Sequence, residues 1–373
     1  AHSGPVEFIF RKHRVATSPA DAVRQAVAAG LNIRTDFTPP EVYANLLREN
    51  VKSGALPMSV IDERVRDILR VKFWLGLFDQ PYVADPAAAG KIVRAPAHLA
   101  LADRAARESI VLLKNDGGAL PLKRDGLKKI LVAGPLADDP HGWWSRYAPQ
   151  KLDFVTPLAG LRAKLGSDVE VRYAQGVAAK DEHFPESDVL KDPPSEKVRA
   201  GIAEAVAAAR DVDLIVAALG ETDELCRESA SRTSLELPGY QEELLEALQA
   251  TGKPLVLVLS NGRPLSVNWA VKHVPAILEM WFPGESGGAA LADILFGDTN
   301  PSGRLPVTFP RSVGQIPMNF PVHPGGQARD PGMVTGPLFP FGFGLSYTKF
   351  TYANLKISPT RAGANSPIEI TCD

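Results

Sequence analysis

The stretch 213-DLIVAALGE-221 decides the fold of this chain, because it reads as a strand that is apolar on both faces and ends on a carboxylate. Comparable apolar runs occur at 129–133, 169–174, 254–260 and 276–282. Amphipathic helical patterns separate them near 98–115, 156–165, 195–210 and 238–251, with another after 285. Strands of Val, Ile, Leu and Ala that alternate with helices are typical of a parallel sheet covered on both faces. The sequence therefore predicts an α/β domain, with ligands bound at the carboxyl ends of its strands.

The regions on either side of this α/β domain have different patterns. Residues 1–80 are mainly helical, with helices predicted at 18–30, 39–53 and 59–75 and a short strand at 31–35. This block is too small to bury both of its faces, so the pattern favours the last turn of a larger parallel β/α structure. Linkers are predicted at 81–97 and 313–348, the α/β domain at 98–312, and the first strands of a β-sandwich at 349–373.

The composition is that of a globular protein without a strong charge bias. Lys and Arg number 41 against 43 Asp and Glu, a formal net charge of −2, which points to neither nucleic acid nor a membrane surface as a partner. Cys226 and Cys372 provide no disulfide framework and no Cys-based zinc site, and the histidines lack metal-ligand spacing. No apolar run is long enough to span a membrane. No phosphate-binding or dinucleotide-binding glycine motif occurs, so no cofactor is predicted.

The two ends of the sequence suggest a piece of a longer protein. The first residues, 1-AHSGPVEFIFRKH-13, begin without Met and lack the successive regions of a signal peptide. The last residues, 367-PIEITCD-373, stop within a strand pattern. If the chain is such a piece, the absence of a signal peptide from these residues gives no information about the location of the protein.

The loop 225-LCRESASRTSLELPG-239 places carboxylates where the sheet is expected to bind ligands. A general acid needs a carboxyl group within reach of a leaving oxygen and an environment that keeps it protonated. Glu228 is one candidate, although a loop glutamate is more often a solvated surface charge. Glu221 and Glu224 are close competitors and Asp223 is a weaker one, and spacing alone does not choose among them.

Two other motifs allow different functions. The run 284-GESGG-288 matches the G-x-S-x-G nucleophile elbow between a strand and a helix, and Asp298 and His323 follow in the order of an α/β-hydrolase triad. Its simpler interpretation is a glycine-rich turn in which Ser286 caps the helix. The paired indoles of 142-GWWSRY-147 could form a platform for a sugar ring, but packing in the core is the more frequent role of Trp.

Several long segments resemble glycoside hydrolase family 3, and its bacterial β-glucosidases in particular. They are 64-RVRDILRVKFWLGLFDQPY-82, 107-RESIVLLKNDGGALPL-122, 225-LCRESASRTSLELPGYQEELLEAL-248, 252-GKPLVLVLSNGRPL-265, 281-WFPGESGGAALADILFGDTNPSGRLPVTFP-310 and 338-LFPFGFGLSYTKF-350. The resemblance implies that residues 1–80 end a (β/α)8 barrel, that 98–312 form an α/β sandwich and that 349–373 begin a fibronectin III-like domain. It also implies a retaining β-glycosidase, most simply a β-glucosidase that releases terminal glucose by double displacement.

The resemblance assigns roles to three residues of this chain. Glu228 matches the family's acid/base in the pattern Glu-x-x-x-Arg before a Leu-Pro-Gly helix start, with Glu221 as the runner-up. Arg232 matches the Arg of that pattern and is expected to help position the site and bind substrate, although Ser231 stands where many members have Asp. Trp144 resembles the aromatic side chain that stacks on the sugar beyond the cleaved bond.

The resemblance also implies that the nucleophile lies outside this chain. The family's nucleophilic Asp would fall at about His2 or just before Ala1, and no Asp precedes Asp21. We therefore expect residues 1–373 to be inactive or nearly so alone, and a non-catalytic carbohydrate-binding or interaction role is the alternative. A serine esterase that uses Ser286 becomes a remote alternative.

The family also indicates partners and a location. The expected substrate is a β-linked oligosaccharide or an aryl glucoside, and the choice between glucose and xylose stays open. A homodimer, or association with the missing part of the same enzyme, is also left open. The resemblance implies a periplasmic or secreted protein.

Overall fold

The computed structural model describes residues 4–35, 38–147, 152, 154–318, 320–321 and 334–373. It divides into two compact units, Ala1–Val93 and Arg94–Asp373, each with a hydrophobic core of its own. The point of division lies inside 81–97, which the sequence assigns to a linker. The domain boundaries themselves remain predictions.

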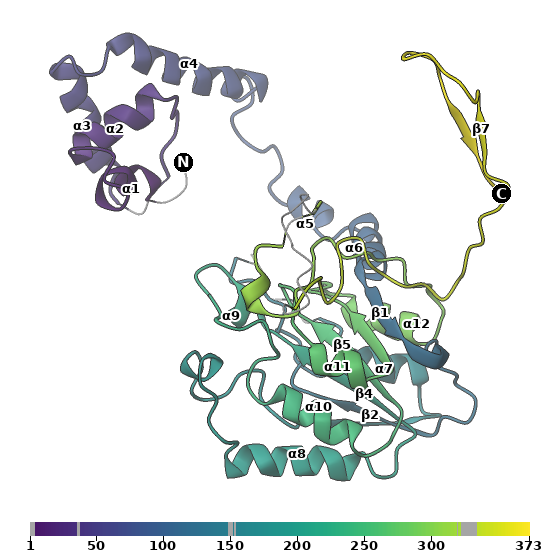
Figure 1. Ribbon diagram of the computed structural model, residues 1–373. Coiled ribbons are helices and arrows are strands. Elements are labelled where there is room, and N and C mark those ends of the chain that lie inside the picture. Colours follow the sequence, from purple (N-terminus) through teal and green to yellow (C-terminus); the bar gives the residue numbers. More distant parts are fainter. Residues whose placement is uncertain (1–3, 36–37, 148–151, 153, 319, 322–333) are drawn as a thin grey trace. The chain divides into compact units, whose positions relative to one another are not determined.

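The first unit is a set of helices around a small core. Its helices are α1 (Pro5–Arg11), α2 (Pro19–Ala28), α3 (Pro40–Lys52), α4 (Met58–Trp74) and the short α5 (Ala88–Ile92), drawn in purple to blue in Figure 1. Ser18 caps α2 by accepting a hydrogen bond from the backbone N–H of Asp21 at 3.1 Å. The three helices predicted in residues 1–80 are confirmed, with ends that agree to within two residues.

The short strand predicted at 31–35 is not formed, because these residues have an irregular backbone. A β-strand satisfies its backbone groups through a neighbouring strand. Within the described residues of the first unit there is no other strand to supply that edge. Arg34 instead forms an ion pair with Glu7 of α1.

The second unit is built around a six-stranded sheet with the order β1-β6-β5-β4-β2-β3. Its strands are β1 (Val111–Asn115), β2 (Lys129–Ala133), β3 (Glu170–Ala174), β4 (Leu214–Gly220), β5 (Leu255–Ser260) and β6 (Ala276–Glu279). All neighbouring strands are parallel except β1, which pairs with β6 in the antiparallel sense. The predicted α/β architecture is thus confirmed, with one antiparallel edge strand added.

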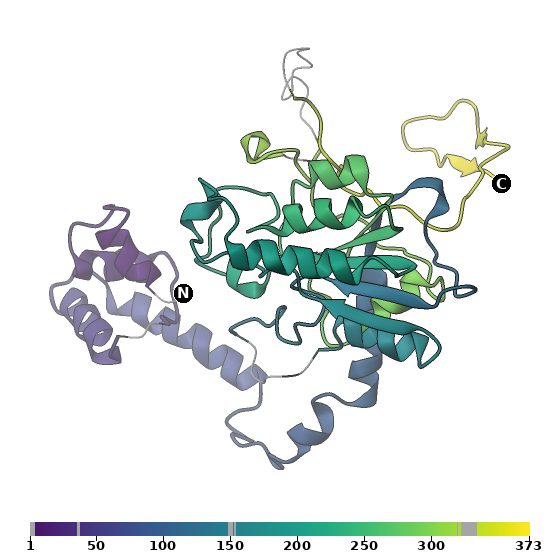
Figure 2. The ribbon, with the colours of Figure 1, turned by 90° about the horizontal axis from the view of Figure 1, so that it is seen from below.

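Helices cover both faces of this sheet (Figures 1 and 2). One face is covered by α6 (Pro96–Ser109), α7 (Pro157–Leu165) and α12 (Gly287–Leu295), and the other by α8 (Glu196–Ala208), α10 (Gln241–Gln249) and α11 (Asn268–His273). Alternate side chains of a strand enter the two cores, as Val216 and Ala217 of β4 do. Burial on both faces explains why each central strand reads as an unbroken apolar run.

The segment from Ile110 to Asn115 corrects the helix predicted over 98–115. Helix α6 ends at Ser109, and β1 begins at Val111. Val111 and Leu113 enter one core and Leu112 the other, which is the alternation of a strand and cannot be met by a helix. The edge of β6 supplies the hydrogen-bonding partner that this stretch needs.

The chain after α12 is mostly irregular but returns to the α/β core. Phe309 and Phe339 form an isolated β-bridge, with ring centroids 6.2 Å apart and edge-to-face, and Leu345 pairs with Leu112 of β1. Part of the segment assigned to a linker therefore packs with the domain. Farther on, β7 (Lys356–Ser358) and β8 (Glu369–Thr371) pair antiparallel where a β-sandwich is predicted to begin. The barrel and fibronectin III-like assignments of the flanking regions remain predictions.

Candidate active site

The carboxyl ends of β4 and β5 come close together because Gly220 has no side chain. Its φ is +138°, and a Cβ atom at this position would lie 2.0 Å from the carbonyl oxygen of Ser260. The next residue, Glu221, donates its backbone N–H to that same oxygen at 2.8 Å. The short helix α9 (Asp223–Cys226) follows at once, so the carboxylates of this connection lie at the expected ligand-binding edge.

Glu221, the runner-up for the acid/base, is fully buried. Its Oε1 accepts a hydrogen bond from Nη1 of Arg232 at 3.0 Å and lies 3.3 Å from Nε of Arg263. Burial raises the pKa of Glu221 above its ordinary value, and the two guanidinium groups oppose that rise. A carboxyl group enclosed in this way is not accessible from the surface, so its position favours a structural role.

Glu228 lies in a tight turn, and its side chain is 55% exposed. The backbone N–H of Ala230 donates to the carbonyl oxygen of Arg227 at 3.0 Å and closes the turn. Ser229 follows with φ of +65°, in the left-handed region that a serine rarely adopts. Such a backbone persists only where the surroundings enforce it. The turn therefore presents Glu228 at the surface in a constrained geometry.

The loop that carries the two indoles lies beside Glu228. Nη2 of Arg146 donates to Oε2 of Glu228 at 3.0 Å, and the hydroxyl group of Tyr147 donates to the same oxygen. The backbone N–H of Asp223 donates to the carbonyl oxygen of Gly142 at 2.8 Å. The structure thus brings 142–147 and Glu228, which are distant in the sequence, into one site.

The two adjacent indoles have different environments. Trp143 is buried and stacks on Phe154, with ring centroids 5.4 Å apart and an interplanar angle of 16°. Trp144 is half-buried, and its ring centroid lies 5.5 Å from that of His141. The packing interpretation holds for Trp143, while the stacking of Trp144 on a sugar remains a prediction.

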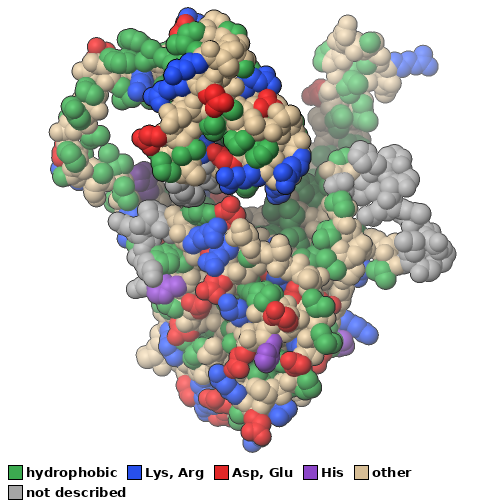
Figure 3. All heavy atoms as spheres, turned by 90° about the vertical axis from the view of Figure 1, so that its left-hand side faces the viewer, with side chains coloured by type: hydrophobic (Ala, Val, Ile, Leu, Met, Phe, Trp, Pro, Cys, Tyr) green, Lys and Arg blue, Asp and Glu red, His purple; other side chains and the backbone are tan. Residues whose placement is uncertain are grey.

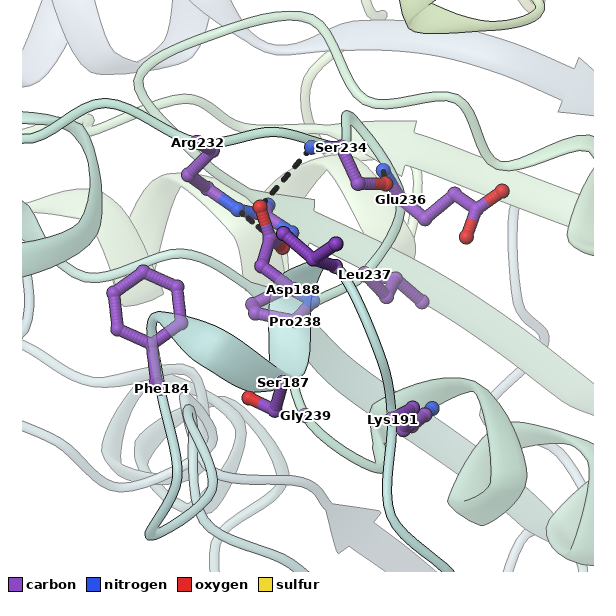
Figure 4. A pocket seen from close by; sticks show the side chains of 11 residues that line it. Phe184, Ser187, Asp188, Lys191, Arg232, Ser234, Glu236, Leu237, Pro238 and Gly239 are labelled. Atoms are coloured by element: carbon purple, nitrogen blue, oxygen red, sulfur yellow. Dashed lines mark hydrogen bonds and ion pairs between the residues drawn. The ribbon is translucent and has the colours of Figure 1, made fainter.

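Arg232 is enclosed by two carboxylates, and its side chain is only 1% exposed. Its Nη2 lies 2.7 Å from Oδ1 of Asp188, which ends a 3-10 turn over Glu186–Asp188 (Figure 4). Asp188 also accepts the backbone N–H groups of Thr233 and Ser234 at 2.6 and 3.0 Å. Burial alone would raise the pKa of Asp188, but the hydrogen bonds from Arg232 and Ser234 hold it below its usual value. This geometry suits a residue that holds the loop, and contact of Arg232 with a substrate remains a prediction.

Three polar residues near this loop, Glu279, Asn261 and Arg263, are not predicted from the sequence as part of the site. Glu279 ends β6, earlier than the predicted limit of that strand at 282, and accepts hydrogen bonds from the backbone N–H of Trp281 at 2.8 Å and from Nδ2 of Asn261 at 2.9 Å. Complete burial raises the pKa of Glu279 to about 8. Asn261 also donates to the carbonyl oxygen of Arg263 at 2.8 Å. The available signal was a charged residue inside the apolar run 276-AILEMWF-282.

The glycines of 284-GESGG-288 have a packing role. A Cβ atom on Gly288 would lie 2.0 Å from the carbonyl oxygen of Thr156, at the start of α7. Ser286 precedes α12 but makes no side-chain hydrogen bond to cap it, so that part of the simpler interpretation is not met. Asp298 pairs with Lys164, and His323 lies outside the described residues. The described part of the chain therefore gives the serine-hydrolase hypothesis no supporting contact.

The described ranges contain neither a metal-binding group of side chains nor a membrane-spanning helix. Among these residues no group of three or more His, Cys, Asp or Glu side chains is placed to bind a metal ion. None of the described helices combines the length and the apolar character needed to cross a membrane. Lys and Arg side chains are interspersed with Asp and Glu over the face shown in Figure 3, in keeping with the small net charge.

Sequence comparison places the chain among known enzymes. Residues 110–347 match the model of the glycosyl hydrolase family 3 C-terminal domain. The chain is 42% identical, over 93% of its length, to a periplasmic beta-glucosidase of Salmonella typhimurium, of which it covers 48%. It is 34% identical, over 97% of its length, to a beta-xylosidase of Formosa agariphila, of which it covers 50%. The chain thus spans about half the length of the curated relatives it matches.

Solved structures agree with this result. A β-glucosidase from Erythrobacter marinus matches with a TM-score of 0.86 at 40% identity, over 98% of this chain and 50% of that one. The β-glucosidase of Listeria innocua in complex with isofagomine matches with a TM-score of 0.80 at 30% identity, over 95% of this chain and 48% of that one. The family resemblance seen in the sequence motifs is confirmed, and the chain belongs to glycosyl hydrolase family 3.

Proposed function

We propose that this chain is the acid/base-bearing part of a retaining β-glycosidase, with Glu228 as the acid/base. The observation that carries the proposal is the placement of Glu228 in a constrained surface turn at the carboxyl edge of the sheet, beside the loop with Trp144. Family membership supports it, since relatives of this chain are named as β-glucosidases and β-xylosidases. Among the nearby carboxyl groups, Glu221 is excluded from the surface. Glu224 and Glu228 are both exposed and ion-paired, to Lys180 and to Arg146, and Glu228 is the one whose partner belongs to the loop with Trp144.

The proposed reaction has two steps. An Asp carboxylate from the barrel domain attacks the anomeric carbon, while the carboxyl group of Glu228 gives its proton to the departing glycosidic oxygen. The C–O bond to the leaving group breaks, and a glycosyl ester forms. A water molecule then attacks the anomeric carbon as Glu228 takes its proton, and cleavage of the ester bond frees both the sugar and the Asp carboxylate.

The substrate follows from the relatives. We propose a β-linked oligosaccharide or an aryl β-glucoside, because relatives include β-glucosidases and a structure in complex with isofagomine. Xylosides are the second choice, since β-xylosidases are also among the relatives. A periplasmic or secreted location is proposed from the name of the Salmonella relative.

The proposal is tested by replacing Glu228 in the full-length protein, meaning the product of the complete gene that contains this sequence. Glu228→Gln removes the proton donor, so hydrolysis of an unactivated glucoside is expected to fall by about 10²- to 10⁴-fold. A dinitrophenyl glucoside, whose leaving group needs no proton, is expected to lose much less in its first step. Glu221→Gln is the matched variant. If it alone gives this dependence on the leaving group, the assignment of Glu228 is wrong.

A further inference from the structure

The backbone of the turn that carries Glu228 is contacted by the guanidinium group of Arg263, a residue that follows β5. Nη2 of Arg263 donates to the carbonyl oxygen of Leu225, and it lies 3.5 Å from the carbonyl oxygen of Ala230. These two residues stand on either side of Glu228 in the sequence. A single guanidinium therefore ties both ends of the segment from which the proposed acid/base projects.

Arg263 is itself fixed by buried groups from two strands. Its Nε lies 3.3 Å from Oε1 of Glu221, which follows β4, and its carbonyl oxygen accepts a hydrogen bond from Asn261. Asn261 in turn donates to Glu279 at the end of β6. The ends of β4, β5 and β6 thus join in one polar cluster, in which Glu221 contacts the side chain of Arg263 and Asn261 holds its backbone.

Arg232 provides a second anchor that shares the same carboxylate. Glu221 binds Nη1 of Arg232 at 3.0 Å. Asp188 binds its Nη2 at 2.7 Å (Figure 4). Burial raises the pKa of Glu279 to about 8, so Asp188 and Glu221 are the carboxyl groups that pair with the two arginines. The ion pairs tie these side chains together, although Oε2 of Glu221, Oδ1 of Asn261 and Nε of Arg263 are buried without a hydrogen-bond partner among the described residues. Removing one charged member would leave its partner unpaired, which is costly.

We propose that Arg263 is a positioning residue for Glu228, which it serves by clamping the carbonyl groups of Leu225 and Ala230. The inference rests on the proposed role of Glu228. The contacts with Leu225 and Ala230 connect Arg263 to the backbone on both sides of Glu228. Because general acid catalysis depends on sub-ångström placement of the carboxyl group, loosening the clamp impairs proton donation before it impairs folding.

The test uses Arg263→Gln and Arg263→Lys in the full-length protein, with kcat/KM measured for an unactivated alkyl β-glucoside and for a dinitrophenyl β-glucoside. For Arg263→Gln we expect a loss on the order of 10- to 100-fold with the alkyl substrate and a clearly smaller loss with the dinitrophenyl substrate. Arg263→Lys keeps the charge beside Glu221 and is expected to restore part of the loss. It also serves as the variant to measure if Arg263→Gln does not fold.

Arg107→Gln is the matched control. Arg107 is 24% exposed, against 22% for Arg263, and it pairs with Asp103 and Asp293 far from this turn in the sequence. Its replacement is expected to lower the thermal midpoint without changing the ratio of kcat/KM for the two substrates. Equal losses with both substrates in Arg263→Gln and Arg263→Lys would overturn the inference.

Failure of this inference and failure of the proposed function give different results. If Glu228→Gln depends on the leaving group and the Arg263 variants do not, only the positioning role is wrong. If Glu228→Gln itself shows no such dependence, the acid/base assignment fails, and the positioning role is overturned with it. If Glu228→Gln and the Arg263 variants all depend on the leaving group, both the acid/base assignment and the positioning role are supported.

Discussion

Glu221 and Glu228 leave the same strand, yet one is fully buried and the other is 55% exposed. The difference comes from the backbone. Gly220 brings Glu221 against Ser260, whereas the turn closed by Arg227 and Ala230 lifts Glu228 out of the sheet edge. The sequence places both carboxylates at this edge but contains no local signal for which one turns inward. That choice depends on contacts between strands that are separated by a whole helix.

Glu279 is expected to make the stability of the α/β domain dependent on pH. Burial raises its pKa from 4.5 to about 8, so the folded state holds a proton that the unfolded chain has already lost. The contribution of Glu279 to the free energy of unfolding is complete below about pH 4.5, and it is lost as the pH rises through about 8. The slope in between is at most about 1.4 kcal/mol per pH unit.

Glu279→Gln should flatten this dependence, measured as the thermal midpoint from pH 5 to pH 9. Some overall stability is expected to be lost, because glutamine offers one acceptor oxygen where Glu279 accepts from both Trp281 and Asn261. Glu204→Gln, at an exposed position of α8, is the control and should leave the pH dependence of the thermal midpoint unchanged. An unchanged pH profile in Glu279→Gln would show that another group causes it.

At the scale of single elements, the central strands and most helices could be predicted because local sequence determines them. Strands β2, β4 and β5 are buried on both faces, so their apolar runs are unambiguous. The sequence pattern of β1 favours the end of a helix instead of a strand, because its place at the edge of β6 is set by distant residues. Asp188 was missed for a similar reason: it lies in a loop, and its contact with Arg232 joins segments 44 positions apart.

The packing of α12 against α7 gives a prediction about the glycine-rich turn. Gly288→Ala would place a Cβ atom 2.0 Å from the carbonyl oxygen of Thr156, so the two helices must separate. We expect a loss of about 2 kcal/mol or more, since forced overpacking typically costs 1–3 kcal/mol. The thermal midpoint of the domain measures it.

Gly314→Ala is the control in the same unit, because Gly314 lies in the 3-10 turn Val313–Gln315 and its Cβ atom would meet only Oγ of Ser312, at an ordinary 3.7 Å. Alanine is the better helix former, so this variant should be neutral or slightly stabilising. Equal effects of the two substitutions would contradict the packing role of the motif.

At the scale of the whole molecule, the chain carries one proposed half of a catalytic pair. Helix α4 has no buried residue, and Phe73 and Trp74 near its end are 66% and 77% exposed. No Asp precedes Asp21, and the family resemblance puts the nucleophile at about His2 or before Ala1. Residues 1–373 alone are therefore expected to hydrolyse an aryl β-glucoside no faster than buffer does.

That expectation is checked by assaying residues 1–373 alone, residues 1–373 mixed with a separately produced barrel domain, and the full-length protein. Activity should appear in the full-length protein, and the mixture shows whether the barrel can act in trans. Turnover by the chain alone that disappears in its Glu228→Gln variant would contradict the prediction, because it would require a nucleophile within these residues.

The central claim, that Glu228 is the acid/base, is tested most directly by the product that its glutamine variant forms in azide. Without the base, water attacks the glycosyl ester made from a dinitrophenyl glucoside only slowly, so the ester accumulates. Azide attacks it without needing to be deprotonated. Full-length Glu228→Gln is therefore predicted to turn over faster with added azide and to release a β-configured glycosyl azide, identified by NMR. If Glu228→Gln forms no glycosyl azide and Glu221→Gln does, the account is contradicted.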